Sequence, residues 1–114
     1  MSNEIIYALT FAKQSDPNRV VTIQSNGDVF CAGGDLKNMW SKNDETTSTV
    51  PKIGDVEDIS LMIRNLNKPV VSKIQGNVLA GALMIVCNST HAIASNDGTF
   101  TAPEIKMGIR PFMV

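Results

Sequence analysis

Two glycine-containing segments, residues 30–36 (FCAGGDL) and 76–82 (GNVLAGA), have the composition of loops that bind a negatively charged oxygen. Each follows a β-like run and leads into a helix-like run, which leaves backbone N–H groups unpaired at the head of a helix. Two such loops aimed at one point form a cradle that stabilises enolates and other oxyanions. The pair therefore indicates an enzyme, although Gly33, Gly34 and Gly81 are also compatible with tight turns alone.

Few other side chains offer chemistry. Glu104 follows Pro103, where its carboxylate could act as an acid or base or could simply be the acidic residue of a first helical turn. Asp35 is expected to cap the helix that follows it. Cys31 lies in the first loop and could be a nucleophile or a small core residue. The only histidine, His91, lies in an apolar run, and no spacing of histidines and acidic residues indicates a metal site.

Helices and strands alternate along the chain in an order that would position these loops. We expect helices over residues 4–13, from 35 to 40, from Asp55 to Leu66 and up to Asn88, and strands over 19–24, 70–74 and 91–94. The near-continuous apolar run at 19–24 predicts a strand buried on both faces of a sheet. Residues 41–54 carry almost no apolar side chain and predict a mobile surface loop. The alternation predicts an α/β fold with a largely parallel sheet, in a single domain over residues 1–114.

The bulk composition excludes several classes of function. The 114 residues include 10 Lys and Arg against 11 Asp and Glu, which gives no electrostatic basis for binding nucleic acid or an anionic membrane. No apolar run is long enough to span a bilayer, and the first residues do not match a secretory signal. The two cysteines fit small core residues in a reducing compartment, so we expect a cytoplasmic protein.

Four segments in register resemble the crotonase family, the enoyl-CoA hydratase/isomerase superfamily. They are residues 30–37, 68–71, 76–82 and 94–109, and their order and spacing all fit. The resemblance implies a crotonase-like fold of stacked ββα turns forming a spiral, assembled as a homo-oligomer, either a trimer or a pair of trimers. It also implies an acyl-coenzyme A (acyl-CoA) substrate, with coenzyme A as part of the substrate and no separate cofactor or metal.

The resemblance assigns roles to individual residues. It implies that the N–H groups of Gly34 and Gly81 hold the thioester oxygen and that Glu104 moves the proton. The residues implied to bind the substrate around them are Ala32, Gly33, Lys37 and Leu79. A lysine beside the cradle would suit the phosphates of coenzyme A, and a solvated surface lysine is equally compatible with the sequence.

Two departures from the family pattern affect this assignment. Met84 lies three residues after Gly81, where family hydratases carry a second glutamate, and methionine cannot transfer a proton. The sequence therefore favours double-bond isomerisation or a related enolate reaction over the addition of water. The chain is also much shorter than a complete family domain, which predicts a fragment truncated at both ends. A catalytically silent binding or assembly module, or an inactive fragment, is the alternative reading.

Overall fold

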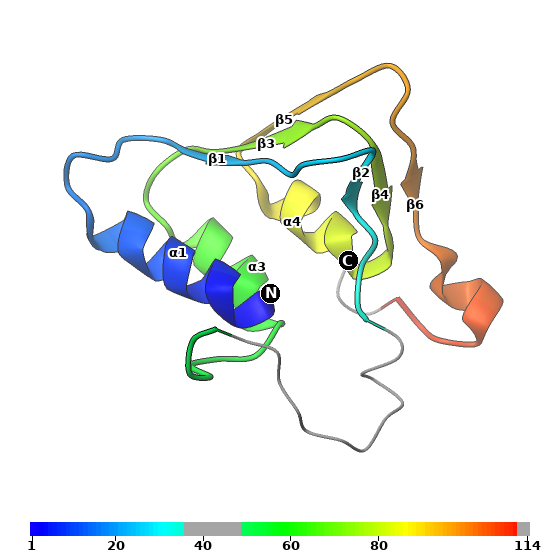
Figure 1. The fold of residues 1–114 in the computed structure, drawn as a ribbon, viewed down its shortest axis with the longest axis horizontal. Coiled ribbons are helices and arrows are strands. Elements are labelled where there is room, and N and C mark those ends of the chain that lie inside the picture. The colour runs from blue at the N-terminus through cyan, green and yellow to red at the C-terminus, as the bar shows by residue number, and fades with distance from the viewer. Residues whose placement is uncertain (36–48, 112–114) are drawn as a thin grey trace.

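The strands of the computed structural model, which describes residues 1–35 and 49–111, form two separate parallel sheets (Figure 1). The first sheet has the order β1-β3-β5, with β1 at Val21–Ile23, β3 at Val70–Ile74 and β5 at His91–Ala94. The second sheet has the order β2-β4-β6, with β2 at Val29–Cys31, β4 at Asn77–Leu79 and β6 at Phe100–Thr101. Each strand of the first sheet leads through a turn into a strand of the second, so the chain bends around one corner three times.

The α-helices lie together beneath the first sheet (Figure 1). Helix α1 (Ser2–Gln14) packs beside α3 (Asp58–Arg64), and α3 packs against α4 (Leu83–Asn88). Two short 3₁₀ helices follow strands of the second sheet, η1 at Ala80–Ala82 and η2 at Pro103–Met107. The parallel strands and the alternating helices confirm the predicted α/β class, although the strands form two small sheets instead of one.

The core has two parts. The larger cluster joins α1, α3 and α4 to β3 through Ile6, Leu9, Ile59, Ile63, Leu66, Val70, Met84 and Ile85. The smaller cluster lies at the junction of the two sheets and consists of Phe30, Ile74, Val78 and Ala82. Burial of these side chains supplies the main driving force for folding. The second cluster matters for function because it fixes β2 and β4, the strands that lead into the two glycine segments.

Three strand predictions were wrong in detail. The run at 19–24 is not buried on both faces, because Thr22 in β1 is exposed, its neighbours Val21 and Ile23 are only half-buried, and Val20 before it is 55% exposed. Two regions predicted as loops contain strands instead, at 29–31 and at 77–79. A three-residue strand is too short to show a hydrophobic period, so its sequence resembles a loop.

The loop and helix boundaries also differ from expectation. The predicted helix at 35–40 and most of the predicted loop at 41–54 lie outside the described residues. At the end of that loop, the N–H and hydroxyl of Thr49 donate to Glu4 Oε1 at 3.1 and 3.4 Å. The terminal ammonium group lies 2.6 Å from Glu4 Oε2. Hydrogen bonds to the Glu4 carboxylate lower its pKa from 4.5 to about 2. The bond from the terminal ammonium group has the largest effect, and the bonds from backbone N–H groups come next.

Side chains near the helix ends show how α1 and α3 are bounded and where two expectations from the sequence were wrong. Helix α3 begins at Asp58 and not at Asp55, and the Asp58 carboxylate accepts the Asp55 N–H at 2.8 Å. Lys68 ends α1 by donating from Nζ to the carbonyls of Ala12 and Ser15, each at 2.6 Å. Cys87 is exposed on α4 and is not a core residue.

A buried pair of hydroxyl groups connects β3 to the end of α4. Ser72 is 0% exposed, and its Oγ lies 2.7 Å from the Oγ of Ser89. Ser89 Oγ donates to the carbonyl of Ile85 at 2.7 Å, so the Ser72 hydroxyl must be the donor to Ser89. The chain of bonds satisfies both hydroxyl groups.

We predict that Ser89→Ala costs more stability than Ser72→Ala. The first change leaves the Ser72 hydroxyl buried without its acceptor, at a cost of about 1–3 kcal/mol. The second removes the buried hydroxyl itself and leaves Ser89 bonded to Ile85. The double variant should cost less than the sum of the two single changes. Urea unfolding of all four proteins measures these costs. A cost for Ser72→Ala equal to or above that for Ser89→Ala would contradict the proposed direction of the bonds, and strictly additive costs would contradict the bond between the two hydroxyl groups.

Candidate active site

The register between β2 and β4 brings the two glycine segments together. Val29 pairs with Asn77, but Cys31 pairs with Val78, so β2 has one extra residue, Phe30, at this point. If the pairing is extended residue by residue from Cys31 and Val78, Gly33 comes opposite Ala80 and Gly34 comes opposite Gly81. Without the extra residue the pairing would be displaced by one, and Gly34 would no longer be level with Gly81.

Direct contact between the segments agrees with this register. A Cβ atom added to Gly33 would lie 2.8 Å from Ala80 Cβ, 2.9 Å from the Leu79 carbonyl oxygen and 3.4 Å from Gly81 N. Gly33 also has a φ of +87°, in the left-handed region that disfavours a side chain. Glycine is therefore required here both by the backbone conformation and by the neighbouring chain.

The second segment has an unusual backbone just before Gly81. Ala80 has a φ of +53°, which a residue with a side chain seldom adopts and which costs free energy. It begins η1, whose C-cap residue Leu83 donates its N–H to the carbonyls of Ala80 and Gly81. The N–H of Gly81 lies in the first turn, where N–H groups have no carbonyl partner inside the helix. An N–H group at such a position is of the kind that can donate to a ligand oxygen.

Glu104 follows the third strand of the same sheet. It lies in η2, which begins two residues after β6, and β6 pairs with β4 through Leu79 and Thr101. The residue is half-buried, and its Oε2 atom is buried without a hydrogen-bond partner in the described part of the chain. A buried carboxylate oxygen without a donor is costly, and such atoms occur where a ligand or a reacting group completes the site.

All three predicted catalytic positions thus lie beyond the carboxyl ends of the strands of the second sheet, which we call the carboxyl edge of that sheet. Gly34 follows β2, Gly81 follows β4 and Glu104 follows β6, and these strands are neighbours that run parallel. Ligands of parallel sheets bind beyond the carboxyl ends of the strands. Sequence reasoning proposed these residues but did not predict that they follow neighbouring strands, because three short strands give no pattern that reveals their order.

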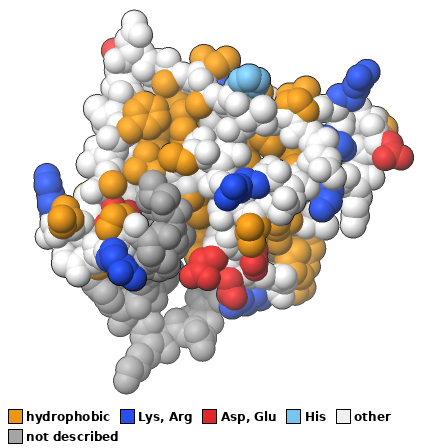
Figure 2. All heavy atoms as spheres, turned by 180° about the vertical axis from the view of Figure 1, so that it is seen from behind, with side chains coloured by type: hydrophobic (Ala, Val, Ile, Leu, Met, Phe, Trp, Pro, Cys, Tyr) orange, Lys and Arg blue, Asp and Glu red, His pale blue; other side chains and the backbone are white. Residues whose placement is uncertain are grey.

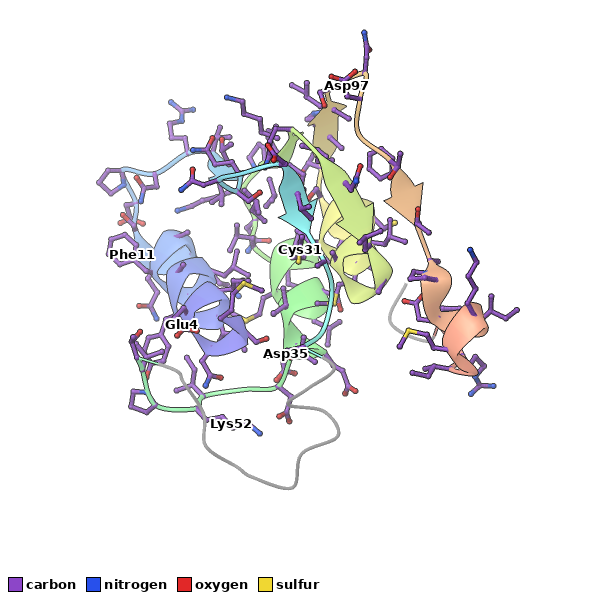
Figure 3. The ribbon with its side chains drawn as sticks, turned by 45° about the vertical axis from the view of Figure 1, so that its right-hand side comes forward. Glu4, Phe11, Cys31, Asp35, Lys52 and Asp97 are labelled. Carbon is purple, nitrogen blue, oxygen red and sulfur yellow. The ribbon has the colours of Figure 1, made fainter. Side chains whose placement is uncertain are left out.

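The other predicted site residues differ in what the structure shows of them. Ala32 is exposed and Leu79 is half-buried, and both flank the contact between the glycine segments. Lys37 lies outside the described residues. Asp35 lies beyond the end of β2, past Cys31 (Figure 3). Met84, at the second-glutamate position of the resemblance, is 4% exposed and packs in the larger core cluster.

A groove in the molecule lies away from these residues. It has a volume of about 240 Å³ between α1 and β1, and its apolar walls include Ile5, Leu9, Val21, Ile23, Ile63 and Ile85. None of the predicted site residues lines it. We therefore place the candidate site on chemical grounds at the edge of the second sheet and not in this groove.

Residues 1–35 and 49–111 hold neither a cluster of metal-binding side chains nor a helix that could span a membrane. Within these ranges, no three His, Cys, Asp or Glu side chains gather as a metal site would require. None of the helices in the same part of the chain is both long and apolar enough to cross a membrane.

Comparison with known proteins places this arrangement in the crotonase fold. An enoyl-CoA hydratase structure from Shewanella pealeana superposes with a TM-score of 0.80 and 26% identity, over 98% of this chain and 43% of that one. A trans-2-decenoyl-[acyl-carrier-protein] isomerase from Streptococcus mutans is 33% identical over 110 residues, or 95% of this chain. The small ribosomal subunit protein mS47 of Neurospora crassa is 28% identical over 104 residues, or 87% of this chain and 20% of that protein.

The sequence profile described as enoyl-CoA hydratase/isomerase matches residues 1–114. The chain therefore belongs to the enoyl-CoA hydratase/isomerase family, as its four motif segments predicted. It spans 42% of the length of the Streptococcus isomerase. The relatives have names from different functional classes, so family membership alone does not determine the reaction.

We predict that Gly33→Ala destabilises the chain more than Gly27→Ala. The two glycines have nearly the same φ, +87° and +88°, but a Cβ at Gly27 would have nothing within 4 Å. Gly27→Ala should cost about 1–2 kcal/mol for the left-handed backbone alone. Gly33→Ala should cost about 2–4 kcal/mol, because the new Cβ also meets Ala80 and the Leu79 carbonyl. Urea unfolding measures the free energy of unfolding of both variants. Equal costs would show that the two glycine segments are not in contact at Gly33.

Proposed function

We propose that this chain carries the oxyanion-binding and proton-transfer groups of an acyl-CoA enzyme of the enoyl-CoA hydratase/isomerase type. The observation that supports this most strongly is the shared sheet edge, where Gly34, Gly81 and Glu104 follow three neighbouring parallel strands. The contact of Gly33 with Leu79 and Ala80 brings the segments that carry the Gly34 and Gly81 amides together, which supports a shared role for them.

The proposed step is removal of a proton from the carbon next to a thioester. The Glu104 carboxylate takes the proton, the C–H electron pair moves into the bond to the carbonyl carbon, and the carbonyl oxygen becomes negatively charged. The N–H groups of Gly34 and Gly81 donate to that oxygen, and a fixed donor of this kind contributes about 3–4 kcal/mol. Return of the proton to a different carbon would complete a double-bond isomerisation.

Met84 favours isomerisation over hydration. Its side chain is buried in the larger core cluster and cannot transfer a proton, so we assign the acid and base role to a single carboxylate, that of Glu104. One carboxylate is sufficient to move a proton between two carbons. The Streptococcus mutans relative is itself named an isomerase.

We further propose that coenzyme A enters as part of the substrate, with Lys37 near its phosphates, and that the protein acts in the cytoplasm as a trimer or a pair of trimers. Support for assembly comes from exposed apolar side chains. Ile93 is 66% exposed, Ile105 is 81% exposed and Phe11 is 68% exposed. Figure 2 shows hydrophobic side chains open to solvent at several places on one face.

We predict that the chain exchanges the α-protons of butyryl-CoA with deuterium in heavy water. Glu104→Gln should slow the exchange by roughly 100-fold or more, because the amide cannot accept the proton. Mass spectrometry follows the deuterium content of the thioester. Glu57→Gln is the matched control, since Glu57 is exposed at the start of α3, and it should leave the rate unchanged.

The binding of butyryl-CoA is measured alongside by equilibrium dialysis. Exchange that disappears in Glu104→Gln and persists in Glu57→Gln supports the proposal. Bound thioester that shows no exchange with the unmodified chain contradicts it, as does exchange that survives in Glu104→Gln.

A second candidate function is a silent module that binds or assembles without catalysis. One observation favours it specifically, namely that the relative mS47 is named as a ribosomal protein. The replacement of a glutamate by Met84 is compatible with it. Binding of butyryl-CoA without any deuterium uptake would be its signature.

A further inference from the structure

We propose that Gln75 is a positioning residue that sets the register between β2 and β4, and through it the alignment of the Gly34 and Gly81 amides. The structural part of this proposal concerns the register alone, and only its catalytic consequence rests on the function proposed above. Gln75 lies between β3 and β4, at the corner where the chain passes from the first sheet to the second.

The Gln75 amide holds the turn between β1 and β2. Its Nε2 atom donates to Ser25 Oγ at 2.8 Å and to the Gly27 carbonyl at 2.9 Å, with the Val29 carbonyl at 3.4 Å. Two of these three atoms are carbonyl oxygens, which only accept, so the nitrogen must face them. The Oε1 atom has no hydrogen-bond partner among the described residues, so the side chain acts here as a donor.

These bonds converge on the irregular point of the β2–β4 ladder. Val29 is the last regular partner before the extra residue Phe30, and its carbonyl receives both the Ser25 hydroxyl at 3.2 Å and the Gln75 amide. A bulge leaves backbone groups without their regular ladder partners. The side chains of Ser25 and Gln75, which donate to the Val29 carbonyl, therefore stabilise the shifted register relative to the regular one.

Close backbone contact at the next residue supports the same alignment. A Cβ on Gly76 would overlap the carbonyl of Asp28, so the β1–β2 turn lies directly against the start of β4. On its other side, the Gln75 carbonyl accepts from Ser95 Oγ at 3.2 Å, in the turn between β5 and β6. Gln75 thus connects all three turns at the corner, and the two N–H groups of its side-chain amide are shared among three acceptors in the β1–β2 turn.

The test uses the full 114-residue chain labelled with ¹⁵N and ¹³C. In the unmodified protein, a nuclear Overhauser effect between the Gly33 α-protons and the Ala80 methyl group should report the shifted register. Gln75→Met keeps the length of the side chain but removes its donors, so this signal should be lost while contacts between β1 and β3 remain. Gln14→Met is the matched control on an exposed glutamine of α1 and should retain the signal.

The catalytic consequence is measured by deuterium uptake into butyryl-CoA, expressed per folded molecule. Misplaced amides should reduce the stabilisation of the transition state more than they reduce the binding of the substrate. Gln75→Met should therefore lower kcat by roughly 100-fold with little change in KM. Ser25→Ala should lower kcat in the same direction and by less, and Ser25→Thr should restore it.

Ser25→Ala also keeps the test decisive if Gln75→Met fails to fold, because it removes one hydroxyl from the same cluster. Persistence of the Gly33–Ala80 signal in a folded Gln75→Met, or in Ser25→Ala when Gln75→Met is unfolded, would overturn the proposal. If the unmodified chain shows this signal but no deuterium uptake, the proposed function fails while the register test still decides the role of Gln75.

Discussion

Close approach of backbone on backbone at the sheet corner determines how the rest of this structure is arranged. Gly76 lies against the carbonyl of Asp28, and Gly33 lies against Leu79 and Ala80. A side chain at either glycine would separate β2 from β4, the two strands that lead into the candidate site. Because the smaller core cluster is built on the same strands, separation would also expose Phe30 and Val78.

The strained conformation of Ala80 fits into this arrangement. A residue with a side chain at φ of +53° persists only where its surroundings fix it, and here the contact with Gly33 does so. The result is a 3₁₀ helix that begins immediately after β4, with its first N–H groups at the carboxyl edge of the second sheet. The stabilising interactions of the fold and the geometry of the site therefore share the same few residues.

The sequence predicted helix α1 and strand β3 closely, because both have clear apolar patterns, and it placed the other two strands of the first sheet. It also selected the glycine segments and Glu104 as candidate site residues, through residue types that a family shares. It failed for the strands of the second sheet, which are two or three residues long and have no period to detect. The extra residue at Phe30 is equally invisible in the sequence, since a bulge depends on the partner strand.

The proposed site requires the amides of Gly34 and Gly81 to point at one oxygen. The most direct measurement is a titration of the ¹⁵N-labelled chain with butyryl-CoA, in which the amide signals of all glycines are followed by NMR. Gly34 and Gly81 should shift together along one saturation curve, while Gly27 and Gly108 remain in place. Binding of the thioester that moves neither amide, or only one of the two, would contradict the proposed site.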